Sequence, residues 1–114
     1  MKNKDFLSIL DISDGNIEHF IQKALTIKTE GAPKILSDKT VALVFEKPSL
    51  RTRVSFEVGI KQMGGHCIFL SNAEIGLGTR EPESDIAKVL DRMVDCIVAR
   101  VFSHKSLEIL AENT

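Results

Sequence analysis

The middle of the chain reads Phe45-Glu46-Lys47-Pro48-Ser49-Leu50-Arg51-Thr52-Arg53-Val54-Ser55-Phe56-Glu57. An apolar run from Thr40 to Phe45 leads into this stretch and predicts a buried parallel strand. Apolar residues at helical spacing follow from Val54 to Met63, and Gly64-Gly65 closes them. We therefore expect Ser49 to Arg53 on a turn that leads from a strand into the N-terminus of a helix.

Such a turn binds anions, because the first backbone N–H groups of a helix lack partners and the helix dipole is positive there. This turn adds the hydroxyls of Ser49 and Thr52 and the guanidinium groups of Arg51 and Arg53. A guanidinium is a planar fork that can bind two phosphate oxygens at once. The pattern predicts a phosphate-binding loop, and its alternative is an ordinary strand-to-helix turn with a solvated basic patch.

Strands and helices alternate along the rest of the chain. Helical spacing predicts a first helix over 16–29, which Gly31-Ala32-Pro33 ends. Further elements are expected as a helix at 51–63, a strand at 66–71, a long loop at 72–82, a helix capped by Ser84 or Asp85, a strand at 96–102 and a helix at 104–112. This order predicts an α/β fold of three layers, βαβαβα, with a parallel sheet and one domain over residues 1–114. Ligands bind beyond the C-terminal ends of parallel strands, where both the loop at 49–53 and Arg100 emerge.

Composition narrows the class of protein. The chain has 114 residues and a formal net charge of -1 at pH 7, which argues against a general binder of nucleic acid or of membrane surfaces. It has no apolar run near the ~20 residues of a membrane span and no recognisable signal peptide, so a cytoplasmic location is expected. Cys67 and Cys96 lie in apolar runs and are expected to be buried free thiols, with a disulfide as the alternative. The 3 histidines lack metal-ligand spacing, and we expect neither a metal nor a cofactor.

The stretch from Phe45 to Glu57 closely resembles the carbamoyl-phosphate signature of the aspartate and ornithine carbamoyltransferases. The similarity continues along the rest of the chain and is closest to the ornithine enzymes. The usual signature has Ser-Thr-Arg-Thr or Ser-Gly-Arg-Thr, whereas this chain has Ser49-Leu50-Arg51-Thr52. The resemblance implies that the chain is the front of such an enzyme, an incomplete carbamoyl-phosphate-binding domain.

The resemblance also implies roles for the residues of this loop. The side chains of Ser49, Arg51 and Thr52 are expected to contact carbamoyl phosphate, and backbone N–H groups of the same turn are expected to share its phosphate. Leu50 keeps its N–H but lacks a side-chain donor, and a hydrogen bond to a charged group is typically worth about 1.5–3 kcal/mol. Arg53 either contacts the ligand or anchors the loop.

The segment from Met93 to Phe102 resembles the family segment whose arginine reaches the ligand, and Arg100 stands in that arginine's place. The resemblance implies that Arg100 binds the phosphate and the carbonyl oxygen of carbamoyl phosphate. A fixed guanidinium there can stabilise the negative charge that grows as an amine attacks, and Thr52 can donate to the same oxygen. Arg100 and Thr52 are therefore the predicted catalytic residues, and the alternative for Arg100 is a surface arginine paired with an acid.

The loop from Glu74 to Pro82 resembles the family loop that crosses into the site of a neighbouring subunit. Ornithine enzymes commonly carry glutamine or histidine near the place of Gly76, and aspartate enzymes carry a serine and a lysine nearby. Arg80 or Thr79 is the candidate for such a contribution here, and a solvent-exposed Arg80 is the alternative. Family members form trimers with sites between subunits, so the resemblance implies a homotrimer for the full-length enzyme.

Family members have two domains and nearly three times this length, and the second domain binds the amino acid. The resemblance implies carbamoyl transfer from carbamoyl phosphate to the side-chain amine of L-ornithine, giving L-citrulline and phosphate, as in arginine biosynthesis or the urea cycle. A chain truncated before the amino-acid-binding domain is expected to be inactive alone. Two alternatives stay open: a non-catalytic module that binds carbamoyl phosphate or phosphate, and a sister carbamoyltransferase acting on aspartate, acetylated ornithine or putrescine.

Overall fold

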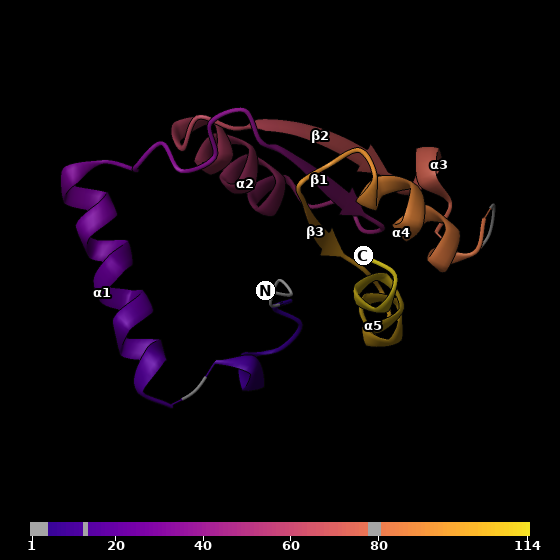
Figure 1. The fold of residues 1–114 in the computed structure, drawn as a ribbon, viewed down its shortest axis with the longest axis horizontal. Helices are drawn as coiled ribbons and strands as arrows, with labels where there is room; N and C mark the ends of the chain where they lie inside the picture. Colours follow the sequence, from indigo (N-terminus) through magenta and orange to yellow (C-terminus); the bar gives the residue numbers. More distant parts are fainter. Residues whose placement is uncertain (1–4, 13, 78–80) are drawn as a thin grey trace. The chain divides into compact units, whose positions relative to one another are not determined.

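The computed structural model describes residues 5–12, 14–77 and 81–114, and it divides between Pro33 and Lys34 into two compact units. The first unit contains a short 3₁₀ helix, η1 (Ile9–Asp11), and the helix α1 (Asp14–Glu30) (Figure 1). The predicted first helix is thus confirmed, with ends slightly further out than 16–29. Gly31 follows it at φ 90°, a left-handed conformation that glycine adopts without strain and that commonly ends helices.

The second unit is built on a parallel sheet of three strands in the order β2-β1-β3 (Figure 1). β1 (Thr40–Phe45) lies in the middle, with β2 (His66–Ser71) on one side and β3 (Cys96–Arg100) on the other. The predicted bounds of β1 and β2 are confirmed. β1 is buried from Val41 to Phe45, as expected for a central parallel strand with both faces covered, and this explains its unbroken apolar run.

Helices cover both faces of this sheet. α2 (Leu50–Gln62) packs through Ile60 into a core cluster to which Val98 of β3 belongs. α4 (Glu83–Asp91) and α5 (His104–Glu112) pack through Ile86 and Leu110 into a second cluster, to which Ala99 of β3 belongs. Successive residues of a strand point to opposite faces, so Val98 and Ala99 place the two clusters on opposite sides of the sheet. The predicted three-layer βαβαβα fold is confirmed.

Two predictions between β2 and α4 are wrong. The stretch 72–82 was expected to lack regular structure, but it begins with a short helix, α3 (Asn72–Ile75), because the Glu74 carboxylate accepts the Ser71 N–H at 3.3 Å and closes the first turn. Neither Ser84 nor Asp85 caps α4. Pro82 occupies the capping position and both residues lie in the first turn, where the acidic Asp85 complements the helix dipole.

The third strand was predicted to reach Phe102, but β3 ends at Arg100. The backbone leaves the ladder there, because the Phe102 N–H donates to the Glu46 side chain instead of to a strand carbonyl. Ser103 then begins α5 as its N-cap and accepts the Lys105 N–H at 3.2 Å, as the sequence predicted.

The two cysteines differ in environment. Cys67 is half-buried and Cys96 is exposed, so the prediction of two buried thiols is wrong for Cys96, which lies on an edge strand. Val41 pairs with both residues and therefore separates them by two strand spacings, about 9.6 Å, which exceeds the reach of a disulfide. Neither cysteine forms a disulfide. Burial, and secondarily the carboxylate of Glu57, raises the pKa of the Cys67 thiol above its ordinary value, while Arg53 opposes the rise.

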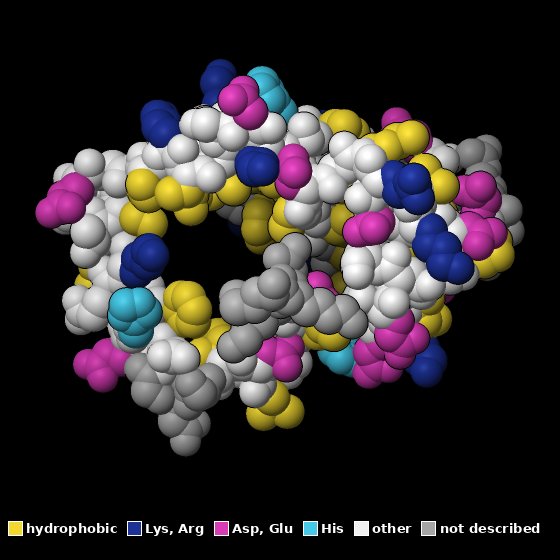
Figure 2. Space-filling model, viewed as in Figure 1, with side chains coloured by type: hydrophobic (Ala, Val, Ile, Leu, Met, Phe, Trp, Pro, Cys, Tyr) yellow, Lys and Arg dark blue, Asp and Glu magenta, His cyan; other side chains and the backbone are white. Residues whose placement is uncertain are grey.

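Charged side chains of both signs share the surface. On the face that Figure 2 shows, Lys and Arg side chains alternate with Asp and Glu side chains instead of forming one basic surface. The small net charge therefore reflects mixing of the two signs, 15 basic against 16 acidic residues. Among the helices that the structure describes, none has the length and apolar character that crossing a bilayer requires.

Candidate functional site

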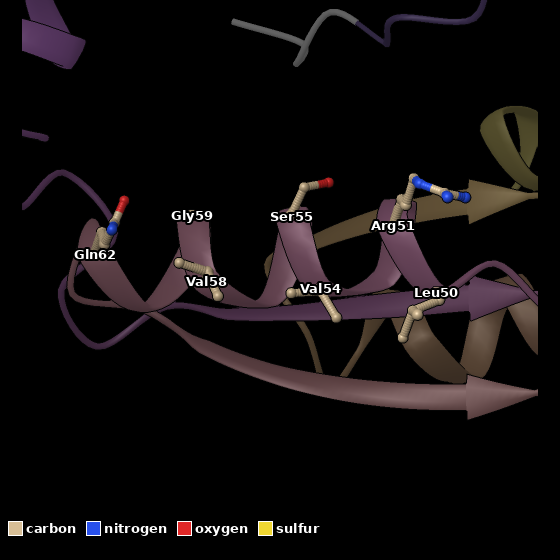
Figure 3. Close-up of a pocket in the computed structure, with 7 residues that line it drawn as sticks. All are labelled: Leu50, Arg51, Val54, Ser55, Val58, Gly59 and Gln62. Carbon is tan, nitrogen blue, oxygen red and sulfur yellow. The ribbon is translucent and has the colours of Figure 1, made fainter.

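The sequence-predicted site lies at one edge of the sheet, where the strands end and α2 begins. Phe45, the last residue of β1, pairs with Ser71 on one side and with Arg100 on the other. Figure 3 shows the first residues of α2, Leu50 and Arg51, at the end of the sheet to which the strand arrows point. Since β2 and β3 lie on opposite sides of β1, the chain reverses its direction across the sheet here, and ligands of open α/β sheets bind at such reversals.

The N-terminus of α2 is open to an anion. Ser49 holds the capping position in extended conformation, and within the residues that the structure describes its hydroxyl makes no capping bond. The first helical bond joins the Arg53 N–H to the Ser49 carbonyl at 3.0 Å. The N–H groups of Leu50, Arg51 and Thr52 therefore have no acceptor within the helix, and the positive end of the helix dipole lies beside them.

The two residues predicted to be catalytic are in contact. Arg100 Nη1 donates a hydrogen bond to Thr52 Oγ1 at 3.1 Å, across a sequence separation of 48 residues. Thr52 is half-buried in the first turn of α2, and Arg100 is exposed at the end of β3. A guanidinium and three backbone N–H groups without an acceptor in the helix thus lie around the same helix start. Such a group of donors suits an anion with several oxygens, such as a phosphate monoester.

Leu50 and Arg51 also line a hollow that is separate from the contact between Arg100 and Thr52. Both are exposed and line a hollow of about 600 Å³ along the outer side of α2, formed with Val54, Ser55, Val58, Gly59 and Gln62 (Figure 3). Thr52 and Arg100 do not line this hollow. The Arg51 side chain extends toward the end of the sheet at which the strands stop (Figure 3). The structure therefore places Arg51 at the rim of the helix start.

Arg53 points in another direction. Its guanidinium carbon lies 3.6 Å from the centre of the Phe69 ring, and its Nε lies 3.3 Å from Glu57 Oε1. Phe69 packs edge-on against Phe45, with ring centres 5.4 Å apart. Arg53 is thus held on the face of the sheet by a cation–π contact and an ion pair. These contacts match the anchoring alternative of the two that the sequence left open.

The loop after β2 is described in part. Gly76 ends α3 in the left-handed conformation, at φ 54° and ψ 49°, and its N–H donates to the Asn72 carbonyl at 2.8 Å. A side chain at this position would cost roughly 1–2 kcal/mol, which favours glycine here. Arg80 and Thr79 lie outside the described residues.

Glu46 and Lys47 also belong to this edge, although the sequence indicated no role for them. The Glu46 N–H donates to the Arg100 carbonyl at 2.8 Å, and Glu46 Oε1 accepts the Phe102 N–H at 3.1 Å. Lys47 Nζ lies 5.1 Å from the centre of the Phe102 ring. Their position between the strand and Ser49 was visible in the sequence. The pairing of β1 with β3, which sets them opposite Phe102, was not.

Three comparisons with known proteins cover nearly the whole chain, and they agree with one another. The profile of the carbamoyl-P binding domain of aspartate/ornithine carbamoyltransferase matches residues 4–114. The ornithine carbamoyltransferase of Methylococcus capsulatus is 46% identical over 113 residues, which are 98% of this chain and 38% of that protein. The crystal structure of the anabolic ornithine carbamoyltransferase of Campylobacter jejuni superimposes with a TM-score of 0.93 at 37% identity, over 98% of this chain and 37% of that one.

A related enzyme with another acceptor shares the fold. A variant of N-acetyl-L-ornithine transcarbamylase, crystallised with carbamyl phosphate and N-succinyl-L-norvaline, superimposes with a TM-score of 0.86 at 31% identity, over 98% of this chain and 40% of that one. The chain thus spans less than half the length of the relatives that it matches. It belongs to the aspartate/ornithine carbamoyltransferase family, through the carbamoyl-P binding domain that its residues 4–114 match.

Proposed function

We propose that the edge formed by the start of α2 and the end of β3 binds carbamoyl phosphate. The phosphate lies against the N–H groups of the first turn of α2, with the Ser49 hydroxyl and the Arg51 guanidinium as further donors. Arg100 and Thr52 reach the carbonyl oxygen, and Leu50 contributes only its N–H. The observation that carries this proposal is the 3.1 Å contact between Arg100 and Thr52, which joins the two separate segments at one place.

In the reaction that we propose, the side-chain amine of L-ornithine attacks the carbonyl carbon of carbamoyl phosphate. A C–N bond forms, the C–O bond to the phosphate breaks, the amine loses a proton, and the products are L-citrulline and phosphate. Negative charge grows on the carbonyl oxygen and on the leaving phosphate, so a guanidinium fixed beside both stabilises the transition state. Arg100 occupies the position from which it can do this, and removal of such a donor costs on the order of 10²–10³ in rate.

This chain supplies the carbamoyl-phosphate half of that reaction. We propose that residues 1–114 are the carbamoyl-phosphate-binding domain of a two-domain enzyme, and that transfer requires an amino-acid-binding domain that these residues do not include. We further propose that the complete enzyme is a cytoplasmic homotrimer of arginine biosynthesis, in which the loop with Gly76 and Arg80 reaches the site of a neighbouring subunit. Resemblance to the family supports these proposals.

A second candidate is a non-catalytic module that binds carbamoyl phosphate or phosphate. Leu50 favours it, because this side chain is 77% exposed at the helix start and offers no donor where one form of the family signature has a threonine. A third candidate is transfer to another amine, because the residues that would select the acceptor belong to the second domain. The family's acetylornithine enzyme shares this fold, so the fold does not choose between acceptors.

Titration calorimetry with fresh carbamoyl phosphate tests the proposal. We expect the chain to bind it, and Arg51→Ala to bind it about 10-fold or more weakly, since a charged hydrogen bond is lost. Arg92→Ala is the matched control, because Arg92 ends α4 ahead of β3 and so lies toward the opposite edge of the sheet. Citrulline formation by the chain alone is expected to be absent. Binding that is missing, or equally strong in Arg51→Ala, rejects the proposed site.

A further inference from the structure

One acidic residue next to this site has no part in the proposed chemistry. Glu46 follows β1 directly, is half-buried, and lies on the chain between Phe45 and Ser49. A carboxylate close to an anion site repels the anion, so its presence lowers affinity unless it contributes something else. Its hydrogen bonds show what that contribution is.

Glu46 holds the backbone at Arg100 and just after it. Its N–H donates to the Arg100 carbonyl at 2.8 Å, which completes the pairing of Phe45 with Arg100 at the end of the β1–β3 ladder. Its Oε1 accepts the Phe102 N–H at 3.1 Å, at the point where β3 has ended and α5 has not begun. One residue thus fixes the segment from which the Arg100 side chain extends.

The same residue is fixed relative to the start of α2, because Lys47 and Pro48 are all that separates it from Ser49. Lys47 adds to the attachment through its contact with the Phe102 ring. Arg100 in turn reaches back to Thr52. The two halves of the anion site, on α2 and on β3, are therefore connected at the backbone through Glu46 and at the side chains through Arg100.

We infer that Glu46 is a positioning residue, whose carboxylate holds the end of β3 so that the Arg100 guanidinium stays beside Thr52. The inference rests on the proposed function of this site as a carbamoyl-phosphate site. Glu46 acts as a hydrogen-bond acceptor and its charge is not required. A glutamine amide oxygen can accept the same N–H, so Glu46→Gln keeps the arrangement, whereas Glu46→Ala loses it.

The test measures two quantities on the full chain, wild type and variants. Amide hydrogen exchange at Phe102, followed by NMR, reports the bond itself, and titration with carbamoyl phosphate reports the site. We expect Glu46→Ala to accelerate exchange at Phe102 at least 10-fold and to weaken binding about 10-fold. Glu46→Gln is expected to stay within about threefold of wild type in both measurements. Glu112→Ala, an exposed glutamate at the end of α5, is the control and should match wild type.

The outcomes separate this inference from the proposed function. If wild type binds and Glu46→Ala binds equally well, the inference is overturned while the function stands. If Glu46→Gln is as weak as Glu46→Ala, the charge matters and the acceptor role is wrong. If wild type does not bind carbamoyl phosphate, the proposed function fails. Amide exchange at Phe102 then decides alone whether Glu46 fixes the end of β3. Unchanged exchange in Glu46→Ala would overturn this structural role as well.

Discussion

Replacing Thr52 with valine removes one hydroxyl and keeps the shape of the side chain. The hydroxyl accepts the Arg100 Nη1 hydrogen bond at 3.1 Å and is the proposed donor to the carbonyl oxygen of the ligand. A hydrogen bond to a charged group contributes about 1.5–3 kcal/mol, and the exposure of Arg100 places this one at the lower end. Since 1.4 kcal/mol is a factor of ten, Thr52→Val should weaken carbamoyl-phosphate binding about 10-fold.

The same substitution should leave the fold nearly unchanged. The contact is at the surface, so the free energy of unfolding in urea should fall by about 1.5 kcal/mol at most. Thr26→Val is the matched control, because Thr26 is an exposed threonine of α1 whose hydroxyl donates to the Gln22 carbonyl of its own helix. This control should bind carbamoyl phosphate with wild-type affinity.

A double-mutant cycle in the calorimeter decides whether the contact itself matters. Thr52 and Arg100 touch, so the losses in Thr52→Val and Arg100→Ala should overlap, and the double variant should bind only slightly more weakly than Arg100→Ala. Losses that add completely would show that the two residues act independently. A Thr52→Val variant with wild-type affinity would refute the reasoning from the 3.1 Å contact altogether.

Three further predictions concern other residues of the second unit. Leu50→Thr adds a hydroxyl at the helix start and should tighten carbamoyl-phosphate binding about 10-fold in the same titration, whereas Leu50→Ala should not. Arg53→Met removes the stacking on Phe69 and should lower the free energy of unfolding in urea by about 0.5–1 kcal/mol while affinity changes less than about threefold. Iodoacetamide at pH 8, followed by mass spectrometry, should alkylate the exposed Cys96 before Cys67, because burial raises the pKa of the Cys67 thiol and the thiolate is the reactive form.

Each of these has a contrary result. Equal affinity of Leu50→Thr and Leu50→Ala would mean that this position faces away from the ligand. A large loss of affinity in Arg53→Met, with unchanged stability, would return Arg53 to the ligand-binding set. Faster alkylation of Cys67 than of Cys96 would contradict the half-buried position of Cys67 on β2.

The strands were predictable because their signal is local. β1 and β2 are continuous apolar runs with turn residues on both sides, and their bounds are those expected. The separate roles of Arg51 and Arg53 were not predictable in the same way. Two residues apart on a helix, their side chains are rotated by about 200° around the helix axis. Arg51 and Arg53 therefore cannot both face the anion site. The sequence alone did not tell which of them lies over the sheet, and the contact of Arg53 with Phe69 shows that it is Arg53.

The contacts that assemble the site are the least visible in the sequence. Arg100 meets Thr52 across 48 residues and Glu46 meets Phe102 across 56, and neither separation leaves a periodic pattern. Both contacts depend on the strand order β2-β1-β3. Had the strands followed in the order of the chain, β2 would lie between β1 and β3, and Phe45 would not pair with Arg100. The connection from β2 to β3 runs back past β1 on the face of the sheet opposite to α2, so β3 lies directly beside β1. The loop that starts α2 therefore meets the end of β3. The strand order therefore determines whether these donors form one site, and the sequence determines only which donors are available to it.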